Sequence, residues 1–509
     1  MIFPKPLSFA AASLVLVALA GCTVGPNFHK PKPPAETGYR PGGDSGVAAA
    51  GAAPAQRFDP GKEIPADWWA LFRSPDLDAT VKQTIAGNRT LVQGRATLMQ
   101  ALQVQAQAEG GQYPQLNVAA QAERQRLDFA VLGIPASPAF PKFSEFNVFS
   151  IGPSVSYTLD IWGGTRRLIE ERKAQAEFQA YQLAASYLSL TGNAVMQAVT
   201  IAGVRAQIAA ANDIIASDEE NLKLVKRQLQ AGEGTQIEVE SAQSQLENDR
   251  TLLPPLRQQL SVARNALSLL AGKSPADWTP PDFDLDRLTL PDNLPVTLPS
   301  QLVRQRPDIL AAEAQLHAAS AAVGVATAQL YPSITLSAAY EQLSTSVTSW
   351  FAVYNNAWNI VGNLTAPIVH GGELTAQKKA AKAAFDATVA GYEQTVLVSF
   401  NQVANVLDAL QHDSELVDAQ KRALDAAERS LKLTRTSYTG GNVSILLVLD
   451  GQRRYEQARL GYVRAVVQRY LDTVQLFAVM GGGWRNWQQT QLPAPQDHGD
   501  KVLDRLLSP

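Results

Sequence analysis

The sequence predicts a mainly α-helical protein that also carries membrane-type β-strands and consists of two copies of one structural unit. Three observations predict this fold class. Apolar residues repeat every seven positions over long stretches, which is typical of coiled-coil helices. Four segments of about ten residues alternate in polarity, as membrane strands do. Similar residues also recur in the same order in the two halves of the chain, which indicates an internal repeat.

The N-terminus predicts a secretory leader over residues 1–21. Lys5 supplies a positive charge, residues 7–19 are apolar, and Leu19-Ala20-Gly21-Cys22 follows. Such a run is too short for a membrane helix and typical of a signal peptide. The tetrapeptide resembles a bacterial lipobox, which implies that Cys22 becomes the mature N-terminus and carries N-palmitoyl and S-diacylglycerol lipid. Thr23 after it favours delivery to the outer membrane. The alternative is an ordinary signal peptide with a chance cysteine.

The rest of the composition excludes several classes of protein. Cys22 is the single cysteine, so the chain has no internal disulfide and no thiolate cluster for a metal. The net charge of -3 carries no nucleic-acid signature. We find no later run of about 18 uninterrupted apolar residues, so any bilayer crossing is expected from strands. Residues 22–66, rich in Pro, Ala and Gly, are predicted to form an extended tether.

The internal repeat defines the predicted domains. Residues 67–280 form the first copy, residues 281–484 form the second, and residues 485–509 are a C-terminal tail. The two copies share residues at a constant offset of 209, the difference between 222 and 431. The matching pairs are Leu222/Leu431, Lys223/Lys432, Leu224/Leu433, Gly232/Gly441, Val239/Val448, Gln243/Gln452, Glu247/Glu456 and Arg250/Arg459.

Each copy is expected to contain a very long helix. In the second copy the seven-residue seam consists of Val389, Val396, Val403, Leu410, Val417, Leu424, Leu431 and Tyr438. In the first copy it consists of Ile201, Ile208, Ile215, Leu222 and Leu229. A helix over 373–438 would be about 100 Å long at 1.5 Å per residue. In the first copy, Pro254-Pro255 predicts a kink in the returning helix. On this pattern alone, a soluble coiled-coil rod remains an alternative.

The predicted strands are residues 115–125, 146–159, 333–343 and 358–368. Their apolar residues lie at alternate positions, as in Ile334, Leu336, Ala338 and Tyr340. Aromatic residues gather near the expected hairpin tips, as in an interfacial girdle: Phe140, Phe143, Phe146, Trp350, Phe351, Tyr354 and Trp358. A soluble sheet is the alternative. Four strands do not close a membrane barrel with a lumen, and open sheet edges are not tolerated in lipid, so several chains must pool their strands.

Together these features resemble the TolC-type outer membrane factors, in particular the NodT/OprM-like lipoprotein branch of RND efflux systems. The resemblance covers nearly the whole mature chain. The most specific matching residues are Trp68-Trp69, Asn88, Leu91, Arg306-Pro307-Asp308-Ile309, Ala312-Glu313, Gly324-Val325-Ala326, Tyr331-Pro332-Ser333-Ile334-Thr335-Leu336 and Gly481-Gly482-Gly483-Trp484. The resemblance implies a homotrimer with a shared twelve-stranded β-barrel, to which each protomer contributes four strands. It also implies a trimeric α-barrel in the periplasm, with a belt that includes the tether and the tail.

Gly232 and Gly441 are predicted to form tight turns at the tips of two helical hairpins, because glycine tolerates left-handed backbone geometry. The resemblance then places the periplasmic aperture just after these turns. By alignment, Leu446 would form an apolar plug and Asp450 an anionic ring. For Leu446 core packing is the alternative, and for Asp450 a solvated carboxylate. Glu238 is a weaker candidate, because the arginine with which it would pair in TolC is replaced here by Val443.

The predicted function is that of an outer membrane channel in a tripartite RND-type efflux system, a passive exit duct for small molecules. The expected partners are two more copies of the chain, a periplasmic membrane-fusion adaptor, an inner-membrane RND pump and outer membrane lipid, without nucleic acid.

No enzyme activity, metal or cofactor is expected apart from the lipid on Cys22, because the five histidines form no spaced ligand pair and no nucleophile or phosphate-loop motif appears. The alternatives are the exit duct of a type I protein-secretion system and a periplasmic coiled-coil adaptor.

Overall fold

The computed structural model describes residues 23–41, 43–44, 56–62, 64–129, 133, 143–352 and 355–484. The predicted leader, Cys22, Phe140, Tyr354 and the tail 485–509 lie outside these described residues. The chain divides into two compact units, each of which draws on both predicted repeats. Unit 1 comprises Met1–Lys30, Met99–Glu177 and Ala314–Ala390, and unit 2 comprises Pro31–Leu98, Phe178–Glu313 and Gly391–Pro509.

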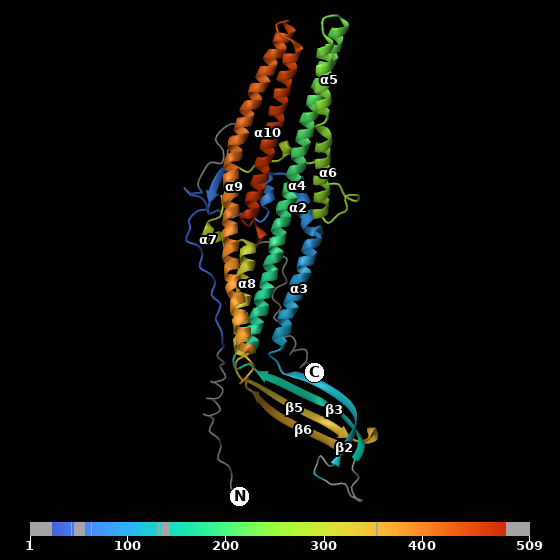
Figure 1. Cartoon of the computed structure of the whole chain (residues 1–509), viewed down its shortest axis with the longest axis vertical. Coiled ribbons are helices and arrows are strands. Elements are labelled where there is room, and N and C mark those ends of the chain that lie inside the picture. Colours follow the sequence, from blue (N-terminus) through green and yellow to red (C-terminus); the bar gives the residue numbers. More distant parts are fainter. Residues whose placement is uncertain are drawn as a thin grey trace. The chain divides into compact units, whose positions relative to one another are not determined.

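The described part of the chain is mainly α-helical. The helices are α2 (Pro75–Gly87), α3 (Arg89–Gly110), α4 (Gly164–Gln230), α5 (Gln236–Arg250), α6 (Leu253–Leu270), α7 (Pro299–Leu302), α8 (Pro307–Ala328), α9 (Glu373–Thr439) and α10 (Ile445–Val479). Three short 3-10 helices are η1 (Trp68–Phe72), η3 (Leu285–Arg287) and η4 (Val347–Ser349). Hairpin turns join α4 to α5 and α9 to α10, as Figure 1 shows.

The two longest helices, α4 and α9, contain 67 residues each. Their first residues differ by 209 positions (373 minus 164), and so do their last residues (439 minus 230). The seven-residue seam lies on their buried side where they pass through unit 2. Ile201, Val403 and Leu410 are fully buried there. A sustained seam of this kind lets helices pack side by side over many turns.

The returning helix of the first copy is interrupted rather than kinked. α5 ends at Arg250, and α6 begins at Leu253 with prolines in its first turn. A proline within a helix has no N–H to donate and clashes with the preceding turn, so a new helix starts there. The corresponding α10 has no such prolines and runs without a break from Ile445 to Val479.

Unit 1 contains a four-stranded antiparallel sheet in the order β2-β3-β5-β6. The strands are β2 (Gln115–Asp128), β3 (Phe143–Leu159), β5 (Ser333–Ser344) and β6 (Asn356–Thr365). These ends lie within three residues of the positions expected from the alternation. Among the described strands, β2 and β6 pair on one side only and form the two edges of the sheet (Figure 1).

The strand register places the apolar positions of all four strands on one face. In the register Leu116 lies opposite Val155, Tyr157 opposite Leu336, and Tyr340 opposite Trp358. Directly paired residues of antiparallel strands point to the same face of a sheet. The other face carries mostly small and polar side chains: Gln115, Asn117, Gln121, Ser150, Ser154, Ser156, Ser333, Thr335, Ser337, Asn359, Asn363 and Thr365.

Unit 2 contains a large apolar core in which Trp68 stacks on Phe477, with ring centroids 5.1 Å apart. The segment expected to be an extended tether contributes to this unit. Within it, β1 (Arg57–Pro60) pairs in parallel with β4 (Asn293–Val296). The Tyr39 hydroxyl donates to the Thr297 carbonyl oxygen at 2.6 Å. Strands of four residues carry too little periodicity to be recognised in a sequence, so this pairing was not expected.

Two described helices, α4 and α8, are long and apolar enough by composition to cross a membrane. Neither helix contains 18 uninterrupted apolar residues, because Asn193 and Gln197 interrupt α4 and Glu313 and His317 interrupt α8. About half of each apolar window is already buried inside the chain, 56% in α4 and 50% in α8. Buried core helices meet the same compositional test, and these windows are explained by packing.

Candidate functional site

The two predicted tip glycines lie at turns with the same hydrogen-bond pattern. Gly232 has φ 76° and Gly441 has φ 75°. After α4, the Glu233 N–H donates to the Gln228 carbonyl oxygen at 2.9 Å, and Gly232 N–H donates to Leu229 at 3.1 Å. After α9, the Asn442 N–H donates to the Ser437 carbonyl oxygen at 2.9 Å. The Gly441 N–H donates to the Tyr438 carbonyl oxygen, also at 2.9 Å. These paired bonds form the Schellman motif that ends helices on a left-handed residue.

The predicted aperture residues lie in the first two turns of α10. The side chain of Leu446 is 43% exposed, whereas its neighbour Ile445 is 1% exposed and packs in the tip core. Within the single chain, Leu446 is therefore not a core residue. The Asp450 carboxylate contacts Arg453 at 2.5 Å and Arg454 at 2.9 Å. Two arginines thus accompany Asp450, and they offset the negative charge that an isolated carboxylate would present.

Glu238 has a structural role at the start of α5. Its carboxylate accepts a hydrogen bond from the Thr235 N–H at 2.8 Å, and the Thr235 hydroxyl accepts one from the Glu238 N–H at 3.4 Å. This reciprocal pair is a capping box, which satisfies two backbone donors at the helix start. The sequence signature of this cap is Thr-x-x-Glu at 235–238.

The tips of the two hairpins contact each other within unit 2. The Tyr438 hydroxyl of α9 donates to the Gln228 side-chain oxygen of α4 at 2.5 Å. Arg435 of α9 donates to the Ser217 hydroxyl of α4 at 3.1 Å. Beneath these bonds lies a shared apolar cluster drawn from both hairpins: Leu222, Val225, Val239, Ala242, Leu246, Leu431, Ile445, Val448 and Leu449. Separation of the hairpins would require both the polar bonds and this apolar contact to break.

The residues directly after Cys22 dock on the strand–helix junction of unit 1. Val24 N–H donates to the Trp162 carbonyl oxygen at 3.0 Å. The guanidinium of Arg167 is buried, with 4% side-chain exposure, and it donates to the Val24 carbonyl at 3.2 Å and to the Asn27 side chain at 2.7 Å. Gly324 allows this approach, because a Cβ there would lie 2.8 Å from the Arg167 side chain. The first described residues are thus held in place by a buried cation.

A second layer supports that docking. Phe28 stacks on His317, with ring centroids 4.3 Å apart, and His317 contacts Glu170 at 2.9 Å. Burial acts to raise the pKa of Glu170. Hydrogen bonds from His317 and Arg167 outweigh this effect and hold that pKa below its usual value. Glu170 therefore stays ionised and balances the buried arginine.

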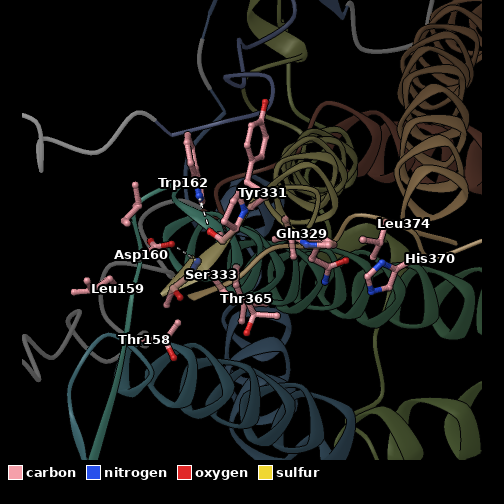
Figure 2. A pocket seen from close by; sticks show the side chains of 18 residues that line it. Thr158, Leu159, Asp160, Trp162, Gln329, Tyr331, Ser333, Thr365, His370 and Leu374 are labelled. Atoms are coloured by element: carbon pink, nitrogen blue, oxygen red, sulfur yellow. Dashed lines mark hydrogen bonds between the residues drawn. The ribbon is translucent and has the colours of Figure 1, made fainter. Parts of the chain in front are cut away.

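A cavity of about 530 Å³ lies beside this docking site, where the strands of unit 1 meet its helices. Figure 2 shows its lining, which includes Asp160, Trp162, Tyr331 and His370. Trp162 stacks on Tyr331 with centroids 4.6 Å apart and donates to the Pro332 carbonyl oxygen at 2.8 Å. The Tyr331-Pro332 pair thus connects the end of β3 to the start of β5. No set of side chains in this lining resembles a catalytic arrangement of nucleophile and base.

Arg306, from the matching motif Arg306-Pro307-Asp308-Ile309, joins three helices of unit 2. Its guanidinium donates to Asp308, to the Val479 carbonyl at 2.9 Å and to Gln402 at 2.8 Å, so it joins α8, α9 and the end of α10. Trp484 donates to the Gln305 carbonyl at 2.6 Å. These residues hold the C-terminal end of α10 in the core of unit 2.

The described chain thus combines very long paired helices with a four-stranded sheet whose apolar face is exposed. The sequence profile of the family described as outer membrane efflux protein matches residues 80–273 and 298–482. The chain belongs to this family and is an efflux protein of the outer membrane.

Individual relatives agree with this assignment. The chain is 30% identical over 424 residues to the pyoverdine export outer membrane protein OpmQ of Pseudomonas aeruginosa, an alignment that covers 83% of this chain and 88% of that protein. It is 26% identical over 474 residues to the cation efflux system protein CusC of Escherichia coli, over 92% of this chain and 98% of that one. The solved structure of the outer-membrane channel OprN matches with a TM-score of 0.81 and 26% identity, over 91% of this chain and 100% of that chain.

Proposed function

We propose that three copies of this chain form the outer membrane channel of a tripartite RND-type efflux system. Small molecules would leave the cell through it without chemical change. The observation that carries this proposal is the sheet of unit 1, which has one exposed apolar face and two unpaired edges.

The unpaired edges support assembly with other chains. Backbone N–H and C=O groups without partners cost several kcal/mol each in hydrocarbon, so a membrane sheet must close on itself. Four strands are too few to enclose a lumen. If β2 of one chain pairs with β6 of the next, three chains pool twelve strands and every edge is satisfied.

The exposed apolar face supports insertion in lipid. Leu116 and Val118 of β2 are each 71% exposed, and Ile360 of β6 is 76% exposed. Burial of each such side chain in an apolar medium is favourable by roughly 1.5–3 kcal/mol. Lipid against this face would supply that burial, and the polar face would then line a water-filled lumen.

The docked N-terminal segment supports a lipid anchor on Cys22. Thr23 packs against Gly163, four residues after the end of β3. A lipid on the preceding residue would therefore begin at the level where the strands end. Covalent N-palmitoyl and S-diacylglycerol chains there would insert in the leaflet beside the barrel.

The equal offsets of α4 and α9 support an origin of the chain by duplication of one strand–hairpin unit. In the trimer these helices would form the α-barrel. Leu446 and Asp450, with the arginines beside Asp450, would line its aperture at the hairpin tips. An apolar constriction can close a pore by expelling water, and nearby charges set its ion preference.

Transport through such a duct needs an energy source elsewhere, so we propose an inner-membrane RND pump and a periplasmic adaptor as partners. By their names, the relative OpmQ serves pyoverdine export and the relative CusC serves cation efflux, which favours small solutes over secreted proteins as cargo. A duct for type I protein secretion would share the same tube and is the alternative. Export assays on a deletion strain, with dyes, antibiotics, metal ions and a reporter protein, distinguish the two.

Cysteine cross-linking in outer membranes tests the trimer. One cysteine is placed in β2 at residues 115–121 and one in β6 at residues 358–364, in a series of pairs. At the correct register, oxidation should link chains into a covalent ring of three. The control is a pair of cysteines at Ser154 of β3 and a β6 position, because β3 already has strands on both sides. If no β2–β6 pair links chains, or if the control links them equally well, the proposed assembly is wrong.

A further inference from the structure

Three buried carboxylates come together in unit 2, away from the predicted aperture. Asp218 lies on α4, Asp249 on α5 and Glu456 on α10. Their exposed fractions are 1%, 6% and 4%. One carboxylate oxygen from each lies within 4.8 Å of the other two. The cluster therefore joins both helices of one hairpin to the returning helix of the other.

The carboxylates lack the partners that such burial normally requires. Neither oxygen of Asp218 has a hydrogen-bond partner, and neither does Oε1 of Glu456. Asp249 accepts one bond, from the Gln245 side chain at 2.6 Å. Among the described residues, no salt bridge involves any of the three. Buried charges are normally paired or bound to metal, because their desolvation is otherwise uncompensated.

The nearby cation Arg435 hydrogen-bonds to other groups, and it reaches Glu456 through its charge alone. The guanidinium of Arg435 donates to Gln452 at 2.5 Å and to Ser217 at 3.1 Å. Gln452 in turn donates to the same Ser217 hydroxyl at 3.0 Å. These bonds form a polar layer beside the cluster and leave the unpartnered oxygens of Asp218 facing the other two carboxylates.

We propose that Asp218, Asp249 and Glu456 form a binding site for a hard divalent cation, of the class of Ca²⁺, Mg²⁺ or Mn²⁺. Oxygen ligands on opposite sides of Ca²⁺ lie about 4.6–5.2 Å apart, twice the usual ligand distance, and closer ligands suit the smaller ions. All three protein ligands are carboxylates. This donor set favours hard cations over copper, which prefers thiolate, thioether or imidazole ligands. The bound ion is a structural element of the chain and not its cargo.

The position of the site gives the ion a mechanical role. It would bridge α4 and α5 to α10 and thereby hold the two hairpins together below the tip core. Removal of the ion would leave three carboxylates to repel one another across that contact. The hairpin pair should then separate more easily.

Binding of Mn²⁺ to the full chain, purified in detergent and stripped of metal, tests the site directly by electron paramagnetic resonance. The wild-type protein should bind one Mn²⁺ per chain, and Ca²⁺ or Mg²⁺ should displace it. Asp218→Asn and Glu456→Gln should each weaken Mn²⁺ binding by about tenfold or more. The control Glu240→Gln should bind as the wild type does, because Glu240 is an exposed carboxylate on α5 bonded to Gln236.

A thermal unfolding series separates a bound ion from bound protons. Mn²⁺ should raise the unfolding temperature of the wild type and of Glu240→Gln, and of neither cluster variant. Absence of stoichiometric Mn²⁺ binding to the wild type would overturn the proposal. So would equal binding by the cluster variants. A third result would also overturn it: Mn²⁺ leaves the unfolding temperature of the wild type unchanged, and Asp218→Asn unfolds at a higher temperature than the wild type. In that case bound protons, and not a metal ion, would neutralise the carboxylates.

Discussion

The two tip turns allow a prediction in which the same substitution has opposite effects at different glycines. A Cβ added at Gly441 would meet no atom within 4 Å, and the same holds for Gly391 in the interior of α9. Steric contact within the chain therefore contributes nothing at either position. The difference lies in the backbone, because Gly441 has φ 75° whereas Gly391 lies in regular helix.

The magnitudes follow from these conformations. A left-handed backbone costs a residue with a Cβ about 1–2 kcal/mol, so Gly441→Ala should destabilise the tip by that amount. Gly391→Ala should stabilise its helix by about 0.5–1 kcal/mol, because alanine loses less conformational entropy. A change of 1–2 kcal/mol corresponds to roughly a 5- to 30-fold change in the opening equilibrium.

Amide hydrogen exchange of residues 436–446, measured on the assembled protein, reads this equilibrium at the tip. Exchange of these residues should accelerate in Gly441→Ala but not in Gly391→Ala. In Gly232→Ala, exchange should accelerate at the turn between α4 and α5. If tip exchange in Gly441→Ala is unchanged or slower, the left-handed turn does not limit tip opening and the reasoning fails.

Three further predictions concern the caps, pH and the aperture. Thr235→Ala should destabilise the start of α5 by about 1 kcal/mol through loss of its capping box, seen as faster amide exchange there. The control is Ser444→Ala at the start of α10, where no side-chain cap bond exists, and it should change amide exchange at the tip much less. Burial and the neighbouring Asp472 carboxylate raise the pKa of Asp413 to about 8. An unfolded aspartate titrates near 4, so between about pH 4 and pH 8 the folded chain retains a proton that the unfolded chain has lost, and stability falls as pH rises. Asp413→Asn should reduce that fall, seen as a smaller difference in unfolding temperature between about pH 5 and pH 8, and an unaltered difference would count against the assignment. Asp450→Ala leaves the arginines beside it uncompensated and should shift bilayer conductance toward anions, and an unchanged ion preference would remove Asp450 from the aperture.

Much of the local structure was predictable because side-chain periodicity survives in the sequence. The seven-residue seam indicated helices over the range of α9, and alternation placed the strands within three residues of their ends. Two further local signals lie in the sequence, the Thr235-x-x-Glu238 cap and the arginines three and four residues after Asp450. Both are readable from spacing alone.

What the sequence did not reveal depends on contacts between distant positions. Arg167 donates a hydrogen bond to Val24, which lies 143 positions earlier in the sequence. The carboxylate cluster brings together residues 218, 249 and 456, whose spacing follows no ligand motif. The pairing of β1 with β4 likewise joins two short segments that carry no signal individually. Such contacts follow only once the helices have been packed.

The number of chains in the native particle tests the central claim most directly. Native mass spectrometry of the protein extracted from outer membranes in mild detergent should give a mass of three lipidated chains. A particle of one chain, with its sheet edges unpaired, would contradict the account, because four strands alone do not enclose a pore.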